Sequence, residues 1–373
     1  MSVDSKTILC VGNFDSNTGY AWKLIESLWV QLSKVGHEKD YRTIACYPSM
    51  SIVNPMLLEQ EIPILVHDFS CTGFLSTFRT IQFIRNNNVT VLYLTDRPSF
   101  SIAYLFFRIS GVKKIITHDH TPGYRPPLTR LRMTFKKIRN RIPFVTIDTA
   151  IGVSPYVCQR LEDVNGVSSN KIQQVINGVQ NCTHTKIQEC HDNKFTFKVV
   201  TVARANYYKG IDFALKVIHD LVRRKGLDVH YTLIGDGPDL DAFQQQAIEL
   251  NISDNVSFLG TQHNIGQRLP AFDIAFHPSR GEAMCLAIVE YLRAGLPVVC
   301  STNKSVNSIL ECGVDSLFYQ EQSVNSAAEE ILKLARQPEL RMVMGVAARR
   351  NYIDKYQESK MMDSFSAVID NCV

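Results

Sequence analysis

The chain has 373 residues, which is too long for one ordinary domain, and its 45% hydrophobic and 20% charged residues exclude a disordered, collagenous or coiled-coil protein. Its 40 Lys and Arg against 36 Asp and Glu leave a formal charge of +4, too small a bias to indicate nucleic acid as the partner. Ten scattered cysteines without a C-x-x-C pair, together with an N-terminus that lacks a secretory signal, predict a cytoplasmic protein, and no apolar run reaches the ~18 residues of a spanning helix.

Short apolar runs rich in β-branched residues alternate with amphipathic stretches along the chain. In the first half these runs cover residues 7–11, 41–46, 62–66, 89–94, 114–117 and 146–153. The pattern restarts at 198–203 and continues at 229–234, 256–259, 274–277 and 297–300. Continuous apolar strands separated by helices are typical of parallel sheets covered on both faces. The sequence therefore predicts an α/β protein with two successive doubly wound parallel sheets.

A polar stretch that is poor in aliphatic residues, 180–193, separates the two patterns and predicts a linker. The predicted domains are residues 1–180 and 194–351, joined through 181–193. Open parallel sheets bind ligands at the carboxyl ends of their strands, so two such domains favour a ligand crevice between them.

Two loops that follow predicted strands contain glycine. The first, 12–19, ends at Gly19 beside a helix start, where it could accept an anion or a sugar hydroxyl, and the second contains Gly235 and Gly237. Neither has the G-x-G-x-x-G spacing of a dinucleotide-binding loop, and a simple tight turn is an equally good interpretation of each. A nicotinamide-dependent oxidoreductase is therefore the weaker alternative for the function.

Two cations, Arg204 and Lys209, follow the first strand of the second half and precede its first helix. Cations at a strand end beside a helix N-terminus suit a diphosphate. Ordinary surface charge is the alternative.

The segment 273–299 holds the densest group of chemistry-bearing residues. A strand ends at His277, a loop carries Glu282, and a helix starting near Cys285 contains Glu290 among apolar neighbours. A carboxylate in such surroundings is costly unless it is paired or bound to ligand hydroxyls. Two unrelated exposed glutamates are the alternative.

Taken in order, these motifs make the second half resemble the retaining nucleotide-sugar glycosyltransferases of family four (glycosyl transferases group 1), which have the GT-B fold. The matching segments are Arg204 with Lys209-Gly210, 234–238, 256–260, Asp273 with Pro278-Ser279, Glu282 through Glu290, and 294–299. The resemblance is strongest over 151–318. The chain departs from the family pattern at Ala203, where glycine is usual, at Cys285, where glycine or proline is common, and over 304–308.

The resemblance implies roles for these residues. Arg204 and Lys209 would bind the donor diphosphate and stabilise the departing nucleotide. Glu290 would hold the ribose hydroxyls, and Glu282 would face the donor sugar. The donor site would be completed by Gly19, Gly235, Cys285 and Leu286. The last stretch, 352–373, would form a helix that returns to the first domain.

Histidines and carboxylates elsewhere could suggest a metal site. By the resemblance, His120 or His118 in the H-x-H at the end of a first-half strand would face the donor sugar, although H-x-H also suits a metal. Asp239-Leu-Asp241 matches the D-x-D of metal-dependent sugar transferases, but it begins a predicted helix, where acidic residues are favoured as capping residues. We therefore expect no metal and no cofactor.

The segment 125–141 carries seven basic residues and no acidic one. The cations include Arg130, Arg132, Lys136, Lys137 and Arg139, and apolar residues recur at helical spacing at Leu128, Leu131, Phe135, Ile138 and Ile142. This pattern predicts a helix on an anionic membrane surface or against an acceptor. In the alternative interpretation the apolar residues pack on the sheet and the cations are solvated.

The resemblance implies an enzyme of the hexosyltransferase type that moves a sugar from a nucleoside diphosphate sugar, such as a UDP-sugar, to a hydroxyl with retention of configuration. The acceptor would be a glycan or a lipid-linked group in cell-surface polysaccharide synthesis, with the enzyme in the cytoplasm or peripheral on the cytoplasmic face of a membrane. A non-catalytic binding subunit or a nucleotide-sugar epimerase of the same fold remains an alternative.

Overall fold

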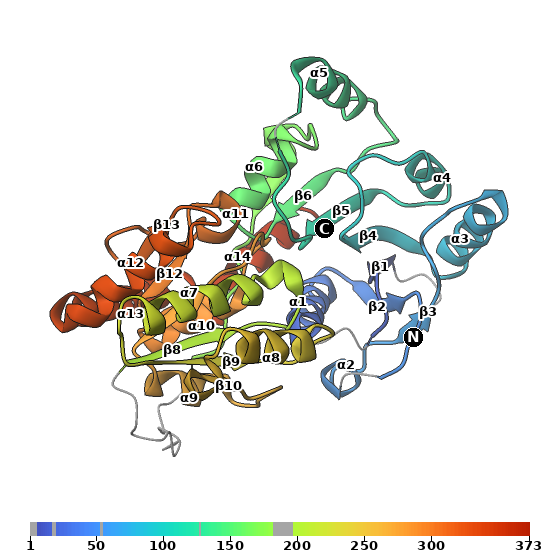
Figure 1. The fold of residues 1–373 in the computed structure, drawn as a ribbon. Coiled ribbons are helices and arrows are strands. Elements are labelled where there is room, and N and C mark those ends of the chain that lie inside the picture. The colour runs from blue at the N-terminus through green and yellow to red at the C-terminus, as the bar shows by residue number, and fades with distance from the viewer. Residues whose placement is uncertain (1–5, 17–19, 53–54, 127, 182–196) are drawn as a thin grey trace. The chain divides into compact units, whose positions relative to one another are not determined.

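The computed structural model describes residues 6–16, 20–52, 55–126, 128–181 and 197–373. The chain divides into two compact units (Figure 1). Unit 1 contains residues 1–121, 125–176 and 361–373, and unit 2 contains residues 122–124 and 177–360. Residues 182–193 of the predicted linker lie outside the described ranges. No helix in the described part of the chain has both the length and the apolar character needed to cross a membrane.

Unit 1 is built on a seven-stranded sheet in the order β3-β2-β1-β4-β5-β6-β7, with every neighbouring pair parallel. The strands are β1 (Lys6–Val11), β2 (Tyr41–Tyr47), β3 (Ile64–Val66), β4 (Val89–Thr95), β5 (Lys114–Asp119), β6 (Thr149–Gly152) and β7 (Ile172–Gln174). The parallel α/β architecture predicted from the apolar runs is confirmed, and β7 is an additional edge strand.

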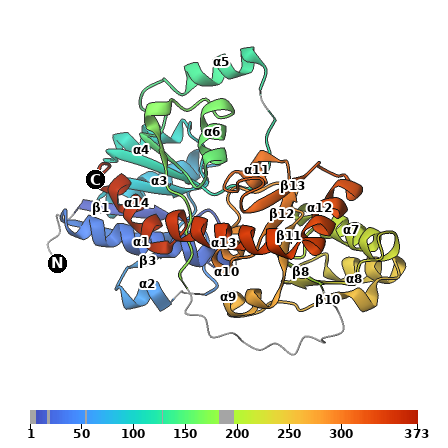
Figure 2. The ribbon, with the colours of Figure 1, turned by 90° about the vertical axis from the view of Figure 1, so that its left-hand side faces the viewer.

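The helices of unit 1 flank this sheet, except for the helix at 130–139, which has no buried residue and stands away from the sheet (Figures 1 and 2). They are α1 (Tyr20–His37), α2 (Pro55–Glu59), α3 (Phe74–Asn86), α4 (Ala103–Ile109), α5 (Arg130–Arg139), α6 (Pro155–Asp163) and α14 (Glu358–Asp370). Trp22 and Trp29 lie two turns apart on α1, and both are buried. Their rings pack edge to face, with 5.8 Å between the ring centroids. Phe365 of α14 is fully buried in the same cluster.

Unit 2 has a six-stranded parallel sheet in the order β10-β9-β8-β11-β12-β13. Its strands are β8 (Phe197–Val202), β9 (Val229–Ile234), β10 (Val256–Phe258), β11 (Ile274–His277), β12 (Val298–Ser301) and β13 (Ser316–Tyr319). Its helices are α7 (Ile211–Arg223), α8 (Leu240–Glu249), α9 (Ile265–Arg268), α10 (Leu286–Ala294), α11 (Lys304–Asn307), α12 (Val324–Arg336) and α13 (Pro338–Lys355). The chain over 352–373 is therefore two helical pieces, since α13 ends at Lys355 and α14 starts at Glu358.

The strand order places particular loops next to each other. In unit 2 the order reverses between β8 and β11, which pair in parallel at Ile274 and Val199. Parallel strands end at the same edge of the sheet, so the loop after β8 and the loop after β11 meet there. In unit 1 the same reasoning brings together the residues that follow β4 and β5, which are neighbours in the sheet.

Candidate active site

Glycines hold the unit 2 loops in close contact. Gly210 has a φ of 72°, and a Cβ built on it would lie 2.1 Å from the carbonyl oxygen of Pro278. Gly235 has a φ of 140°, and a Cβ there would lie 2.0 Å from the carbonyl oxygen of Ala203. Any other side chain at either position would be strained and would force the backbones apart. The loops after β8, β9 and β11 thus form one packed edge.

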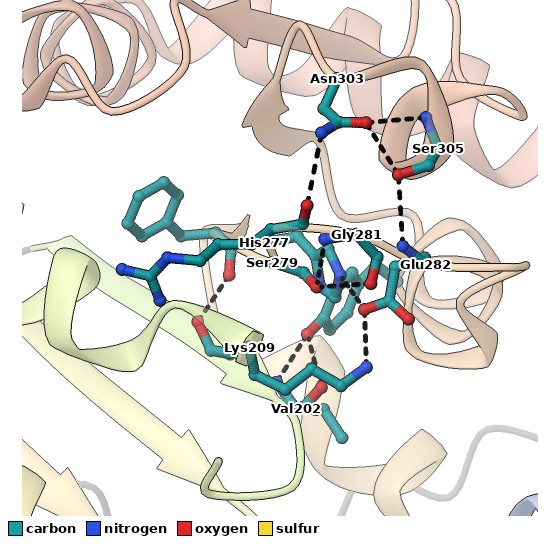
Figure 3. Close-up of polar contacts among 12 residues, drawn as sticks. Val202, Lys209, His277, Ser279, Gly281, Glu282, Asn303 and Ser305 are labelled. Carbon is teal, nitrogen blue, oxygen red and sulfur yellow. Dashed lines mark hydrogen bonds and ion pairs between the residues drawn. The ribbon is translucent and has the colours of Figure 1, made fainter. Parts of the chain in front are cut away.

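A buried charged chain lies where these loops meet (Figure 3). Lys209 Nζ donates to Glu282 Oε1 at 2.6 Å, and His277 Nε2 lies 3.2 Å from the same oxygen. The side chains of Lys209, Glu282 and His277 are only 13%, 6% and 1% exposed. The Glu282 backbone is also anchored, since its N–H donates to Ser305 Oγ at 3.3 Å. The arrangement orients a lysine ammonium and a carboxylate at one point of the sheet edge.

Electrostatic pairing keeps this group ionised. Burial alone would raise the pKa of Glu282, but Lys209 and His277 together hold it well below its usual range. Burial would lower the pKa of His277, yet Cys285 and Glu282 raise it to about 9. The pKa of Lys209 is likewise raised by Glu282 against the opposing effect of burial. At neutral pH the centre therefore holds a carboxylate between two cations.

Cys285 extends the same cluster. It precedes the first turn of α10, and its thiol interacts with the His277 ring. One ligand atom each from His277, Glu282 and Cys285 lies within 4.8 Å of the others, and all three residues are buried. Within the described ranges this is the one such group of three His, Cys, Asp or Glu residues. The sequence placed His277 and Glu282 in one short segment, but it did not predict that the Cys285 side chain lies next to His277.

Glu290 lies on α10 as its sequence context suggested and is 6% exposed. Arg293, one turn further on and also buried, places its Nη2 3.9 Å from Glu290 Oε1. The same guanidinium donates from Nη1 to the carbonyl oxygen of Gln180 at 2.8 Å. The buried carboxylate is therefore charge-compensated, with Arg293 as a partner that sequence analysis did not identify. Leu286 begins α10 and is half-buried.

The loop that carries Arg204 is held by residues from other elements. Arg204 itself is exposed. Arg280 forms a two-pronged ion pair with Asp212 of α7, with both N–O distances at 2.8 Å, and its guanidinium lies over the Tyr207 ring at 4.2 Å. Neither Arg280 nor Asp212 was identified from the sequence, because they are 68 residues apart and belong to different loops.

Asp239 and Asp241 lie at the start of α8, as the helix interpretation required. The mechanism differs from ordinary capping, because the Asp239 carboxylate accepts from the backbone N–H of Tyr207 at 2.8 Å and makes no hydrogen bond to the first turn of α8. Asp239 thus fixes the loop between Arg204 and Lys209.

The H-x-H of unit 1 places its two histidines differently. His118 is fully buried on β5, and its Nδ1 lies 2.5 Å from the Tyr93 hydroxyl. His120 is half-buried beyond the strand end, and its backbone N–H donates to Asp96 Oδ1 at 2.6 Å. Burial lowers the pKa of His120 to about 4 and that of His118 well below its usual value, so both rings are neutral at pH 7. His120 is the more accessible of the two.

The basic segment forms α5, but its apolar residues do not pack on the sheet. Leu131, Phe135, Ile138 and Ile142 are 82%, 66%, 60% and 47% exposed. The helix is instead anchored through its polar side, for example by Lys136 Nζ, which donates to the carbonyl oxygen of Val164 at 2.8 Å. The alternative in which these apolar residues belong to the core is wrong.

Exposed apolar residues also occur on α3 and at α4 of unit 1. They include Phe74, Leu75 and Phe78 of α3, and Ile102, Phe106 and Ile109 at α4. One backbone contact joins the segments before α4 and after α5, because Ser101 N–H donates to the carbonyl oxygen of Val145 at 2.9 Å. Residues 97–147 carry eleven Lys or Arg and a single acidic residue, Asp119. We use the name basic apolar face for the exposed apolar residues of α4 and α5 together with the cations of 97–147.

One predicted site residue, Gly19, lies outside the described residues. The other predicted residues of unit 2 gather at the carboxyl edge of its sheet, namely Arg204, Lys209, Gly235, Glu282, Cys285, Leu286 and Glu290. His120 lies at the carboxyl edge of the unit 1 sheet. The basic residues Arg130, Arg132, Lys136, Lys137 and Arg139 all belong to α5.

Comparisons with curated proteins connect this chain to sugar transferases. An N-acetyl-alpha-D-glucosaminyl L-malate synthase of Bacillus anthracis is 24% identical over 38% of this chain and 37% of its own. A GDP-mannose-dependent alpha-(1-6)-phosphatidylinositol monomannoside mannosyltransferase of Mycolicibacterium smegmatis is 25% identical over 75% of this chain and 76% of its own. The first three curated relatives are matched over only 29% to 48% of their own length.

Solved structures share the fold along nearly the whole chain. A glycosyltransferase from Rickettsia africae superposes with a TM-score of 0.79 at 16% identity, covering 99% of both chains. HepE of Anabaena, in complex with UDP and glucose, superposes with a TM-score of 0.73 at 15% identity, covering 98% of this chain and all of its own. Such low identity supports the fold alone.

Family models account for most of the sequence. Residues 185–351 match the model described as glycosyl transferases group 1, and residues 54–181 match that of Glycosyltransferase Family 4. The two matches follow each other along the chain and correspond to its two parallel-sheet units. The chain belongs to the family-four glycosyltransferases and has their GT-B fold.

Proposed function

We propose that the protein transfers a hexosyl group from a nucleoside diphosphate sugar to a hydroxyl acceptor with retention of configuration. The observation that carries this proposal is the buried Lys209–Glu282 pair at the carboxyl edge of the unit 2 sheet, with Glu290 on the following helix. The UDP and glucose bound by the Anabaena structure and the activities named for the curated relatives support a nucleotide-sugar donor. A non-catalytic subunit would not need to retain these buried charges.

The charges of unit 2 suit the parts of such a donor. Arg204 is exposed and Lys209 is held in place, so together they would bind the diphosphate and stabilise the nucleotide as it leaves. Glu290 would accept hydrogen bonds from the ribose hydroxyls. Glu282, already oriented by Lys209 and His277, would face the sugar where positive charge develops.

The remaining contacts would position the reactants. Gly235 would line the donor site through its backbone, and Cys285 and Leu286 would line it at the start of α10. His120 is neutral at pH 7 and can exchange hydrogen bonds with a sugar hydroxyl without bringing a charge. Catalysis would then come from positioning and from electrostatic stabilisation, and it would need no metal ion.

The acceptor side is proposed from the basic apolar face. Exposed apolar residues bounded by cations are the pattern of an interfacial surface, and each Lys or Arg near an anionic membrane contributes about 1 kcal/mol of attraction. We therefore place the enzyme peripherally on a cytoplasmic membrane face, with a lipid-linked or glycan acceptor used in cell-surface polysaccharide synthesis. The lipid named for the mycobacterial relative's acceptor is consistent with such a location.

A donor screen tests the transferase. Thermal unfolding is measured with UDP-, GDP- and ADP-sugars in excess EDTA, because a bound donor stabilises the folded state by mass action. One class should raise the melting temperature and should be consumed when acceptor is supplied, and the anomeric configuration of the product is read by NMR. A product with inverted configuration, or activity that needs added Mg²⁺ or Mn²⁺, would contradict the proposed chemistry.

Sedimentation with liposomes tests the membrane surface. Binding should require anionic lipid and fall with added salt. It should also weaken in the Leu131→Ser/Phe135→Ser variant, whose substituted side chains are 82% and 66% exposed and contribute nothing to the core. The exposed Met342→Ser variant of unit 2 is the matched control and should sediment like the unmodified protein. Equal recovery with neutral vesicles would remove the membrane from the proposal.

A further inference from the structure

We propose that His277, Glu282 and Cys285 form a binding site for a thiophilic divalent cation, for which Zn²⁺ is the best match. Imidazole nitrogen, carboxylate oxygen and thiolate sulfur are the three ligand types that Zn²⁺ accepts in proteins. Hard cations such as Mg²⁺ prefer oxygen alone, so the donor set selects against them. The proposed donor site uses Glu282 and Cys285, but it gives no reason for a thiol to lie beside the imidazole and the carboxylate.

The separations of the ligand atoms fit the ion. Zn²⁺ bonds of about 2.0 to 2.3 Å in a tetrahedron place neighbouring ligand atoms about 3.3 to 3.7 Å apart. His277 Nε2 and Glu282 Oε1 are 3.2 Å apart, and the three ligand atoms all lie within 4.8 Å of one another. Side-chain shifts of about 1 Å would bring the three ligand atoms to three corners of the coordination tetrahedron, and a water molecule would be the fourth ligand.

The backbone around these ligands is fixed. His277 is the last residue of β11, and Cys285 accepts from Ile288 N–H at 3.1 Å at the start of α10. Glu282 lies between them and is anchored to Ser305. The residues are 1%, 8% and 5% exposed, in the order His277, Cys285 and Glu282. Preorganised ligands in a largely dry setting favour metal binding over hydration of the ion.

The metal and Lys209 would compete for one carboxylate. Lys209 Nζ already contacts Glu282 Oε1, the oxygen that lies beside His277 Nε2 and that a bound cation would need. On binding, Zn²⁺ forms bonds to the sulfur, nitrogen and oxygen atoms, the Cys285 thiol and the His277 imidazolium each release a proton to solvent, and the Lys209 ammonium is displaced from Glu282. The site thus has two mutually exclusive states: in one, Glu282 pairs with Lys209, and in the other, Glu282 binds the metal.

This exclusivity has a consequence that rests on the proposed function. If Glu282 and Lys209 serve the donor, a Zn²⁺ ion bound to Glu282 blocks sugar transfer, and chelator restores it. The protein would then be an enzyme that needs no metal and is inhibited by one.

Cobalt titration of the full chain tests the site without relying on activity. Co²⁺ adopts the same tetrahedral coordination, and a bound thiolate gives a sulfur-to-cobalt charge-transfer band. We expect this band at one equivalent of Co²⁺, its loss on addition of Zn²⁺, and its absence in Cys285→Ser. His277→Gln should weaken Co²⁺ affinity by at least about 100-fold, because loss of an outer-shell partner alone costs about 10- to 100-fold and His277 is a direct ligand. Circular dichroism confirms that both variants are folded.

Other cysteines provide the matched controls. Residues 182–191 contain two cysteines and two histidines, and Cys312 of unit 2 is exposed. The variants Cys182→Ser/Cys190→Ser and Cys312→Ser should keep the full charge-transfer band. A band that survives in Cys285→Ser, or that disappears in either control, overturns the site. Absence of any band in the unmodified protein also overturns it.

A separate measurement distinguishes this site from the transferase proposal. Calorimetry compares UDP binding with and without one equivalent of Zn²⁺, and turnover is measured in parallel. A cobalt band without any transferase activity would support the metal site and contradict the proposed function. Transfer that is active yet gives no cobalt band would contradict the metal site alone.

Discussion

Replacing Lys209 by methionine removes one charge from a buried ion pair and keeps most of the side-chain length. The pair joins Nζ to Glu282 Oε1 at 2.6 Å, with side chains 13% and 6% exposed. Loss of one partner from a buried pair costs about 3 to 5 kcal/mol, because the other charge stays buried without compensation. His277 remains 3.2 Å from the carboxylate, and a pKa of about 9 keeps it protonated at pH 7. We therefore expect the free energy of unfolding to fall by about 3 kcal/mol.

Urea unfolding at pH 7, followed by far-UV circular dichroism, measures this change. Lys225→Met is the matched control, because Lys225 pairs with Glu329 at side-chain exposures of 24% and 52%. An exposed pair of this kind contributes less than about 1 kcal/mol. The double variant Lys209→Met/Glu282→Gln should be more stable than Lys209→Met, since no unpaired carboxylate remains. Equal losses in Lys209→Met and Lys225→Met would refute the reasoning from burial.

Three further predictions concern individual carboxylates and one arginine. Glu282→Gln should lower kcat about 100-fold with little change in UDP affinity, whereas Glu290→Gln should chiefly weaken UDP binding, and equal losses of UDP affinity would contradict this division. Arg204→Ala should weaken binding of a nucleoside diphosphate by about 10- to 150-fold but not that of the nucleoside, as calorimetry can show. Burial and the charge of Asp119 raise the pKa of Asp96 to about 7, against the lowering effect of its hydrogen bond from His120. The native state therefore holds this proton more tightly than the unfolded chain, so stability is lost as pH rises from about 4 to 7, and Asp96→Asn should recover up to about 4 kcal/mol at pH 8 in urea titrations.

The central strands could be predicted because they are buried on both faces. The runs 229–234 and 274–277 coincide with β9 and β11, where nearly every side chain is in the core. The strands that were not predicted, β7 and β13, are the last in their sheets, and β7 is a half-exposed Ile-Gln-Gln. Edge strands can be short and polar because only one neighbour pairs with them.

The placement of candidate site residues was predictable where one local segment carries them. Glu282 and Glu290 belong to a loop and the helix directly after it, so the resemblance could assign both of them to one site, a role that stays a prediction. The pairing of Lys209 with Glu282 bridges 73 positions, and that of Arg280 with Asp212 bridges 68, so both depend on the β8–β11 register. For α5, the helical spacing identified which residues share a face. Whether that face is exposed to solvent depends on how the rest of unit 1 packs, which the local sequence does not show.

The two tryptophans of the chain, Trp22 and Trp29, both belong to α1. Indole emission therefore originates in unit 1 alone, while unit 2 contributes tyrosines such as Tyr231 and Tyr291. During denaturation, tryptophan fluorescence will follow the unfolding of unit 1, and circular dichroism will follow both units. A substitution at Lys209 should thus move the dichroism transition and leave the fluorescence transition in place if the two units unfold independently. The two native tryptophans therefore serve as an intrinsic fluorescence probe of unit 1.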